Sequence, residues 1–367
     1  MKKIVALMAV VALLLCSVAC AKKDNGAAKG GYNVAMVTDV GNIDDQSFNQ
    51  YTWEGCKDWA AANGATANYY RPSEDSDDAR IEAIKTAIEK GANVVVCPGY
   101  LFAGALNAVP AQYPDITFIG IDMTSNESNP GGADVPEPTA NTVVICYKEE
   151  QAGYLAGYAV VKDGYTKLGF LGGIDVPAVV RYGHGFIQGA NDAAKELGNA
   201  ADISVNYWYS GSFAPTDEIK AKMSGWYTDG TEIIFSCGGG IVYSALGAAE
   251  ETANGKVVGV DNDQGGINER VVTSAIKDLK GSTMNILSAV KDNGGKLPEK
   301  YAGHGLVYGI SDNAVGIPTA AGSWRFAKFT VDEYNAAFKN IQSGAVTISN
   351  ATDAHPAVEI AVDYQND

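Results

Sequence analysis

Short apolar runs alternate with amphipathic stretches along the chain from Tyr32 onward. This alternation predicts β-strands joined by helices, which is the pattern of a mostly parallel sheet covered by helices. A first set of elements, strands and helices in turn, is predicted at residues 33–38, 47–62, 67–70, 75–90, 92–97, 101–112 and 117–121. We therefore expect one doubly wound α/β domain in this part of the chain.

The same pattern repeats after residues 126–138, a stretch rich in Pro, Gly and Asn that predicts a loop. A second set of elements is predicted, with strands at 141–146, 167–172, 204–209, 232–236 and 256–260 and helices at 149–161, 181–197, 217–228 and 242–251. We expect a first lobe of residues 32–145 plus about 272–312, and a second lobe of residues 146–271 plus about 313–367. Several crossings between two such domains form a hinge, and ligands of open α/β sheets bind beyond the carboxyl ends of the strands. The sequence therefore predicts a ligand cleft between the lobes.

The first twenty residues have the pattern of an exported lipoprotein. Lys2 and Lys3 precede an apolar run at 4–15 that is too short to span a bilayer, which predicts a cleaved signal peptide over residues 1–19. Cys20 follows small residues and resembles the acylated cysteine of a bacterial lipobox. Residues 20–31 have no apolar period and predict a tether. We expect the protein at the extracytoplasmic face of a bacterial cell membrane, anchored by lipid on Cys20.

The charge balance excludes one class of partner. The chain has 43 acidic against 27 basic side chains, a formal net charge of −16. Such a surface repels polyanions, so we do not expect nucleic acid as a partner.

Four cysteines remain once Cys16 and Cys20 are assigned to the leader and the lipid. They are widely spaced and form no C-x-x-C pair: Cys56, Cys97, Cys146 and Cys237. Buried thiols are therefore favoured over zinc ligands or disulfides, and neither a metal nor a cofactor is expected.

Acidic residues and glycines follow several predicted strands. Asp39, Asp122 and Asp261 occupy equivalent positions after their strands, and Gly239 lies in a Gly-Gly-Gly turn after another. A carboxylate at such a position can accept hydrogen bonds from a ligand, and a glycine lets the backbone approach it closely. Alternatively, each Asp could cap a helix or turn. Three acids at equivalent strand ends favour a binding site.

Longer segments of the sequence resemble one family throughout. They are residues 38–55 (TDVGNIDDQSFNQYTWEG), 150–157 (EQAGYLAG), 172–186 (GGIDVPAVVRYGHGF), 258–264 (VGVDNDQ) and 273–277 (TSAIK). With these segments the chain resembles the basic membrane protein family, the purine-nucleoside-receptor type of ABC transporter substrate-binding lipoprotein. The resemblance implies a type I periplasmic-binding-protein fold with an interdomain cleft, an ABC transporter permease as partner, and a protein that acts as a monomer.

The resemblance also implies roles for individual residues. Phe48 matches a ring that stacks on the base, and Asn49 matches a polar contact beside it. Asp39 and Asp122 match positions that face the base and nearby groups. Asp261 and Lys277 match a pair that holds the ribose hydroxyls. The candidates for a second stacking ring are Tyr100, Tyr182 and Phe235. The chain departs from the family pattern in the loop between Asp261 and Lys277 and in the Gly-Gly-Gly turn.

Two other functions remain as alternatives. A binding protein of the same fold could take a sugar or a signalling furanone, because sugar sites use the same side chains. A calcium-dependent nucleoside hydrolase is remote, because its motif needs an Asp where this chain has Val37. His184, His304 and His355 are scattered and no Gly-x-Ser-x-Gly turn is present, so we expect no enzyme.

Overall fold

A computed structural model of the protein describes residues 31–366. The predicted signal peptide, Cys20 and the predicted tether up to residue 30 lie outside the described residues. Across residues 31–366, no helix combines the length and apolar character that crossing a membrane requires.

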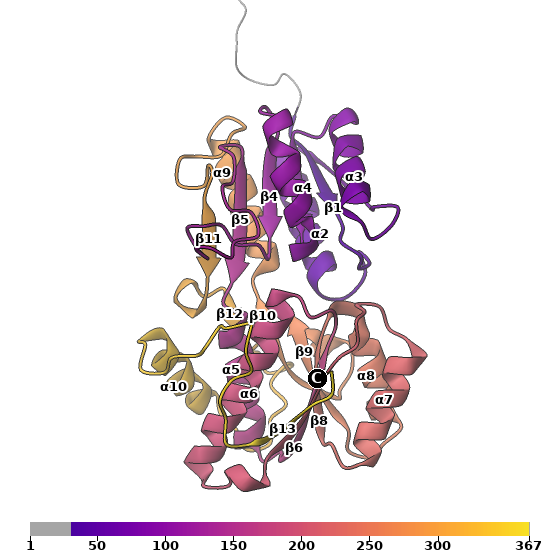
Figure 1. Cartoon of the computed structure of the whole chain (residues 1–367), viewed down its shortest axis with the longest axis vertical. Coiled ribbons are helices and arrows are strands. Elements are labelled where there is room, and N and C mark those ends of the chain that lie inside the picture. Colours follow the sequence, from indigo (N-terminus) through magenta and orange to yellow (C-terminus); the bar gives the residue numbers. More distant parts are fainter. Residues whose placement is uncertain (1–30, 367) are drawn as a thin grey trace, which may run out of the picture. The chain divides into compact units, whose positions relative to one another are not determined.

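Six parallel strands form the first sheet, in the order β11-β5-β4-β3-β1-β2 (Figure 1). Successive residues of a strand point to opposite faces, so Val34 and Met36 pack with α2 and α9, whereas Ala35 and Val37 pack with α3 and α4. We call this sheet with its helices the first lobe. Its elements are β1 (Asn33–Val37), α2 (Phe48–Asn63), β2 (Thr66–Tyr70), α3 (Asp77–Glu89), β3 (Val94–Pro98), η1 (Tyr100–Phe102), α4 (Ala103–Ala108), η2 (Pro110–Gln112), β4 (Thr117–Ile121), β5 (Thr142–Tyr147), α9 (Leu279–Asp292) and β11 (Gly305–Tyr308).

Seven strands form the second sheet, in the order β12-β10-β9-β8-β6-β7-β13. All are parallel except β12, which pairs antiparallel with β10. We call this sheet with its helices the second lobe. Its elements are α5 (Glu149–Asp163), β6 (Lys167–Gly172), α6 (Pro177–Leu197), η3 (Ala200–Asp202), β7 (Ser204–Tyr209), α7 (Asp217–Thr228), β8 (Ile233–Cys237), η4 (Gly239–Ile241), α8 (Val242–Glu250), β9 (Lys256–Asp261), η5 (Gln264–Gly266), β10 (Val271–Lys277), β12 (Val315–Gly316), α10 (Val331–Gln342) and β13 (Ala361–Tyr364).

Three segments of the described chain cross between the lobes: Lys148, Asp278 and residues 309–314, which include η6 (Ile310–Asp312). They are held side by side by backbone hydrogen bonds. The amide of Lys148 donates to the carbonyl of Tyr308 at 2.8 Å, and the amide of Asp278 donates to that of Ala314 at 2.8 Å. These three neighbouring segments form the connection about which the lobes can rotate.

The sheet membership of β10 differs from the sequence-based expectation. Residues 272–312 were expected in the first lobe, but β10 lies in the second sheet, where Ile276 pairs with Asp261 of β9 and Lys277 with Val315 of β12. The chain therefore crosses at Asp278, and only α9 and β11 return to the first lobe. A short buried apolar strand fits either sheet by its pattern, so the sequence could not assign it.

Glycines hold helices α5 and α6 in backbone contact. A Cβ atom on Gly157 would lie 2.0 Å from the carbonyl oxygen of Phe186, and one on Gly189 would lie 2.0 Å from that of Tyr154. No side chain larger than hydrogen fits at these positions. Tyr182 in the amino-terminal half of α6 lines the cavity between the lobes, so this contact fixes its position relative to α5.

Candidate functional site

A cavity lies between the lobes at the carboxyl ends of the strands. Asp39 follows β1, Gly99 follows β3 and Gly238 follows β8, and all three line it. Strand order reverses between β1 and β3 and between β6 and β8, so the cavity lies at the topological switch points of both sheets. The empty space between its lining residues is about 650 Å³ with the open mouth included.

The structure brings together nearly all the candidate residues. Those that line the cavity are Asp39, Phe48, Asn49, Tyr100, Asp122, Tyr182, Gly239, Asp261 and Lys277. Phe235 does not line it. Its side chain is fully buried in β8, with its ring packed edge-on against Phe170 and Tyr182. The prediction that Phe235 could stack on a ligand is corrected by this placement.

One end of the cavity is built around Asn49 at the start of α2. The Nδ2 atom of Asn49 donates to Oδ1 of Asp39 at 2.8 Å and to Oδ2 of Asp45 at 3.2 Å. Because carboxylate oxygens accept hydrogen bonds, the amide must turn its nitrogen toward them. The Oδ1 atom of Asn49 is buried and has no hydrogen-bond partner among residues 31–366. This end therefore offers acceptors to a ligand.

Asp45 was not among the candidates, although it lines the cavity. Its carboxylate accepts hydrogen bonds from the backbone amides of Ser47, Asn49 and Gln50 at 2.8–3.1 Å. It therefore holds the first turn of α2 against the cavity. It follows no strand directly, so the search for polar residues at strand ends did not find it.

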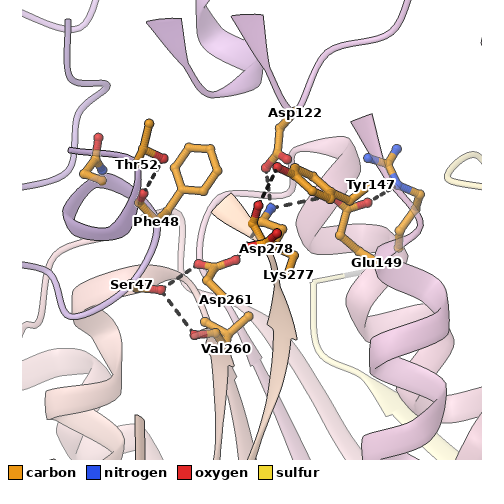
Figure 2. Close-up of polar contacts among 12 residues, drawn as sticks. Ser47, Phe48, Thr52, Asp122, Tyr147, Glu149, Val260, Asp261, Lys277 and Asp278 are labelled. Atoms are coloured by element: carbon orange, nitrogen blue, oxygen red, sulfur yellow. Dashed lines mark hydrogen bonds and ion pairs between the residues drawn. The ribbon is translucent and has the colours of Figure 1, made fainter. Parts of the chain in front are cut away.

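Lys277 lies at the centre of the other end, among three carboxylates (Figure 2). Its Nζ atom is 2.5 Å from Oδ2 of Asp122, 3.5 Å from Oδ1 of Asp261 and 3.5 Å from Oε1 of Glu149. The ring of Phe48 extends from α2 toward this group, and its centroid is 4.8 Å from Nζ. Lys277 is the last residue of β10, so it reaches the cavity by the same strand-end rule as the aspartates.

Burial and mutual charge determine the ionisation of this group. Burial opposes the charge on Lys277, but Asp122, Asp261 and Glu149 outweigh it and raise the pKa of Lys277 above its usual value. Burial also raises the pKa of Asp122, an effect that the Lys277 ammonium partly offsets. At the end of the cavity around Asn49, burial raises the pKa of Asp39 and raises the pKa of Asp45 to about 6. The hydrogen bonds that both carboxylates accept lower these pKa values and offset part of the effect.

Asp122 and Asp261 share a backbone conformation that few residues adopt. Their φ angles are +63° and +64°, in the left-handed region. Among non-glycine residues, Asp and Asn tolerate this region best. Each strand thus turns sharply at its end and directs a carboxylate into the cavity. These are the equivalent strand-end positions that the sequence indicated. Ser47 of the first lobe also contacts the second here, since its Oγ donates to Oδ2 of Asp261 at 2.6 Å (Figure 2).

Phe213 is an aromatic residue of the cavity that the sequence analysis missed. It lies in the loop after β7, and a Cβ atom on Gly173 would be 2.4 Å from its ring. Glycine at position 173 therefore makes room for this ring. The rule that located the aspartates could have found Phe213, because it lies four residues beyond the strand's end.

Comparison with known proteins identifies the family. The Bmp family, described as ABC transporter substrate-binding protein PnrA-like, matches residues 32–345. The chain belongs to this family. Its relatives include the ABC transporter nucleoside-binding protein BmpA of Lactococcus lactis subsp. cremoris (strain MG1363), 27% identical over 79% of this chain and 80% of the relative. Basic membrane protein A1 of Borrelia garinii subsp. bavariensis (strain PBi) is 31% identical over 77% of this chain and 78% of the relative.

A solved structure shows the same fold. An ABC transporter solute-binding protein from Aeropyrum pernix K1 superposes with a TM-score of 0.75 at 17% identity, over 88% of this chain and 94% of that one. The predicted type I periplasmic-binding-protein fold and the predicted family are both confirmed. This Bmp-family member is a substrate-binding protein of an ABC transporter and not an enzyme, and proteins of its family act at the extracytoplasmic side of the membrane.

Proposed function

We propose that this substrate-binding protein captures a purine nucleoside in the cavity between its lobes and delivers it to an ABC permease. The observation that carries the proposal is a set of unsatisfied polar atoms beside aromatic rings. Oδ1 of Asn49, Oδ1 of Asp122 and the hydroxyl of Tyr182 are buried without a hydrogen-bond partner in residues 31–366. Each such atom costs about 1–3 kcal/mol. A polar ligand that reaches them recovers this free energy.

The rings favour a flat ligand. Phe48 comes from the first lobe and Phe213 from the second, and both line the cavity. A planar base between them gains about 0.5–1.5 kcal/mol for each aromatic partner beyond the area buried. A pyranose or furanose alone lacks a π face of this kind, which favours a nucleoside over a sugar. The relative BmpA is named a nucleoside-binding protein, which also supports the proposal.

The charged end suits the hydroxyls of ribose. Asp261 and Asp122 offer carboxylate oxygens, and Lys277 between them offers a donor. A ribose diol has two hydroxyl donors that such carboxylates can accept. At the other end, the acceptors of Asp39 and Asn49 suit the N–H groups of a base.

The same charges exclude phosphorylated ligands. Asp39, Asp45, Asp122 and Asp261 line the cavity with Lys277 as the single basic side chain among its lining residues. Lys277 already contacts carboxylates, so a phosphate would face unpaired negative charge. We infer that nucleosides bind and nucleotides do not.

Calorimetric titration of the purified protein with guanosine, inosine, adenosine, guanosine 5′-monophosphate and ribose tests the proposal. We expect the nucleosides to bind and the monophosphate and ribose to produce no heat of binding. A nucleoside at 100 times its Kd should stabilise the fold by about 2.7 kcal/mol. Binding of ribose without binding of any nucleoside would overturn the proposal in favour of a sugar-binding protein.

We also propose that the protein is a monomer anchored by lipid on Cys20. Acyl chains contribute about 0.8 kcal/mol per buried methylene, so more than one chain gives a stable anchor. Replacing Cys20 with Ala should move the protein from the membrane fraction to the soluble fraction. A Cys20→Ala protein that stays with the membrane would contradict the anchor.

A further inference from the structure

We propose that Glu149 and Arg181, a buried pair beside the hinge, are positioning residues that set the affinity for ligand hydroxyls through Lys277. This inference rests on the proposed binding of a nucleoside. Neither residue lines the cavity. Both act, in this view, by fixing where the Lys277 ammonium lies between Asp122 and Asp261.

The contacts form a continuous chain from one lobe to the other. Nε of Arg181 in α6 donates to Oε2 of Glu149 at 2.7 Å, and the other oxygen of Glu149 lies 3.5 Å from Nζ of Lys277. Nζ in turn donates to Asp122 of the first lobe at 2.5 Å. The chain Arg181–Glu149–Lys277–Asp122 thus connects α6 in the second lobe with the end of β4 in the first.

The middle of this chain lies at the hinge. Glu149 is the first residue of α5, directly after the crossing residue Lys148. Lys277 is the last residue of β10, directly before the crossing residue Asp278 (Figure 2). Groups beside a hinge move least when lobes rotate. Rotation of the lobes should therefore displace Lys277 little.

The charge of Glu149 is buried and paired inside the second lobe. Its side chain is 0% exposed, and a charge buried to this degree is costly unless it is paired. Arg181 provides that pairing, and its second amino group reaches Sγ of Cys146 at 3.3 Å. One oxygen of Glu149 is left for Lys277. Burial opposes the charge on Arg181, but Glu149 outweighs it and raises the pKa of Arg181, so Arg181 stays charged.

Glu149 shares the Lys277 ammonium with the carboxylates that the ligand needs. Lys277 is shared among three carboxylates, two of which line the cavity. Without the charge of Glu149, the ammonium shifts fully toward Asp122 and Asp261 and competes with ligand hydroxyls for their oxygens. Loss of Glu149 should therefore weaken the contribution of the ligand hydroxyls to the binding affinity and leave the contacts of the base unchanged.

A double-mutant cycle between Glu149 and the ligand hydroxyls tests this. The Kd values of guanosine and 2′,3′-dideoxyguanosine are measured for the wild-type protein, for Glu149→Gln and for Glu150→Gln. Glu150 is a matched control, because it is the next residue of α5, is 4% exposed, and is not among the ion-pair partners of Lys277 in residues 31–366. The hydroxyl benefit is the Kd of 2′,3′-dideoxyguanosine divided by the Kd of guanosine. We expect Glu149→Gln to reduce this ratio about tenfold. Glu150→Gln should preserve it.

The outcomes separate this inference from the proposed function. If wild-type protein does not bind guanosine, the proposed function fails. If it does, and Glu149→Gln weakens both nucleosides equally or behaves like Glu150→Gln, the positioning role is refuted. Should Glu149→Gln not fold, the double variant Glu149→Gln/Arg181→Gln removes both charges and serves in its place. An undiminished hydroxyl benefit in that variant refutes the inference equally.

Discussion

Replacing Asp261 with Asn changes one charge in the cavity and little else. Asn tolerates the left-handed backbone at φ +64° and has the same shape as Asp. It can still accept the hydrogen bond that Ser47 donates to Asp261 at 2.6 Å. The fold should therefore be preserved, and the change should act on the ligand.

The expected loss of affinity follows from the type of hydrogen bond that is lost. A hydrogen bond to a charged acceptor contributes about 1.5–3 kcal/mol, and one to a neutral acceptor about 0.5–1.5 kcal/mol. Asp261 is buried, so solvent does not replace the lost charge. Two ribose hydroxyls on this residue would lose about 2–3 kcal/mol together, which is roughly a 30- to 150-fold rise in Kd.

Calorimetry and thermal unfolding with guanosine measure this loss. A ligand concentration that stabilises the wild-type protein by about 2.7 kcal/mol should stabilise a variant with a hundredfold higher Kd by only about 0.4 kcal/mol. The control is Asp44→Asn, because Asp44 is exposed and does not line the cavity. If Asp261→Asn binds guanosine as tightly as Asp44→Asn, Asp261 does not hold the ribose and the assigned orientation of the nucleoside is wrong.

Four further predictions concern the ring, the helix contact, and the pH dependence of binding and of stability. Phe48→Ala should weaken guanosine binding about tenfold while Phe48→Tyr retains it, as measured by calorimetry; equal affinities would exclude stacking on this ring. Gly157→Ala, whose Cβ would lie 2.0 Å from a carbonyl oxygen, should lower the free energy of unfolding in urea by about 3 kcal/mol. Gly225→Ala in α7, where the added Cβ meets nothing within 4 Å, should not destabilise, and equal losses would contradict the close contact. Because burial raises the pKa of Asp122, guanosine affinity should fall as pH falls from 8 to 5, with protons released on binding; a flat pH profile in calorimetry would contradict this. The unliganded protein should respond in the opposite direction, because Asp45 and Glu150, with pKa raised to about 6 and about 7 by burial, hold protons that the unfolded chain releases above about pH 4. Their contribution to stability therefore falls as pH rises from about 4 to 7, and unfolding in urea at both pH values measures it.

The sequence predicted the parts of this protein that follow from local pattern. Strand–helix alternation is set by which residues are apolar, so the order of the main elements and both doubly wound sheets were correct. The strand-end rule located Asp39, Asp122 and Asp261, because the carboxyl ends of parallel strands meet at one edge. The short strands β11, β12 and β13 were not predicted, because two to four residues are too few for a period to show.

Features that depend on tertiary contacts could not be predicted from one sequence. Glu149 lies at the start of a helix whose pattern is ordinary, and only the crossing of chains beside it brings it to Lys277. Lys277 reaches the cavity because β10 extends further than its apolar run, and the pattern of the sequence does not show where this strand ends. The strand-end rule could have found Phe213, but not the space that Gly173 leaves for its ring.

The placement of charge relative to the hinge indicates how binding is coupled to closure. Besides the contacts of Lys277, the lobes are joined by Oγ of Ser47, which donates to Asp261, and by Nε2 of Gln264, which donates to the carbonyl of Gln46 at 3.2 Å. Both involve uncharged donors and can break when the lobes separate. The Lys277 contacts lie beside the crossing segments, where rotation displaces atoms least. A ligand shifts the equilibrium only by the contacts it makes in the closed state and not in the open one. A nucleoside whose ribose is held at the hinge end gains those contacts when Phe48 and Asn49 of the first lobe and Phe213 of the second reach its base. The contacts of the base should therefore shift the equilibrium toward the closed state, whereas the ribose should be held at the hinge end before the lobes close.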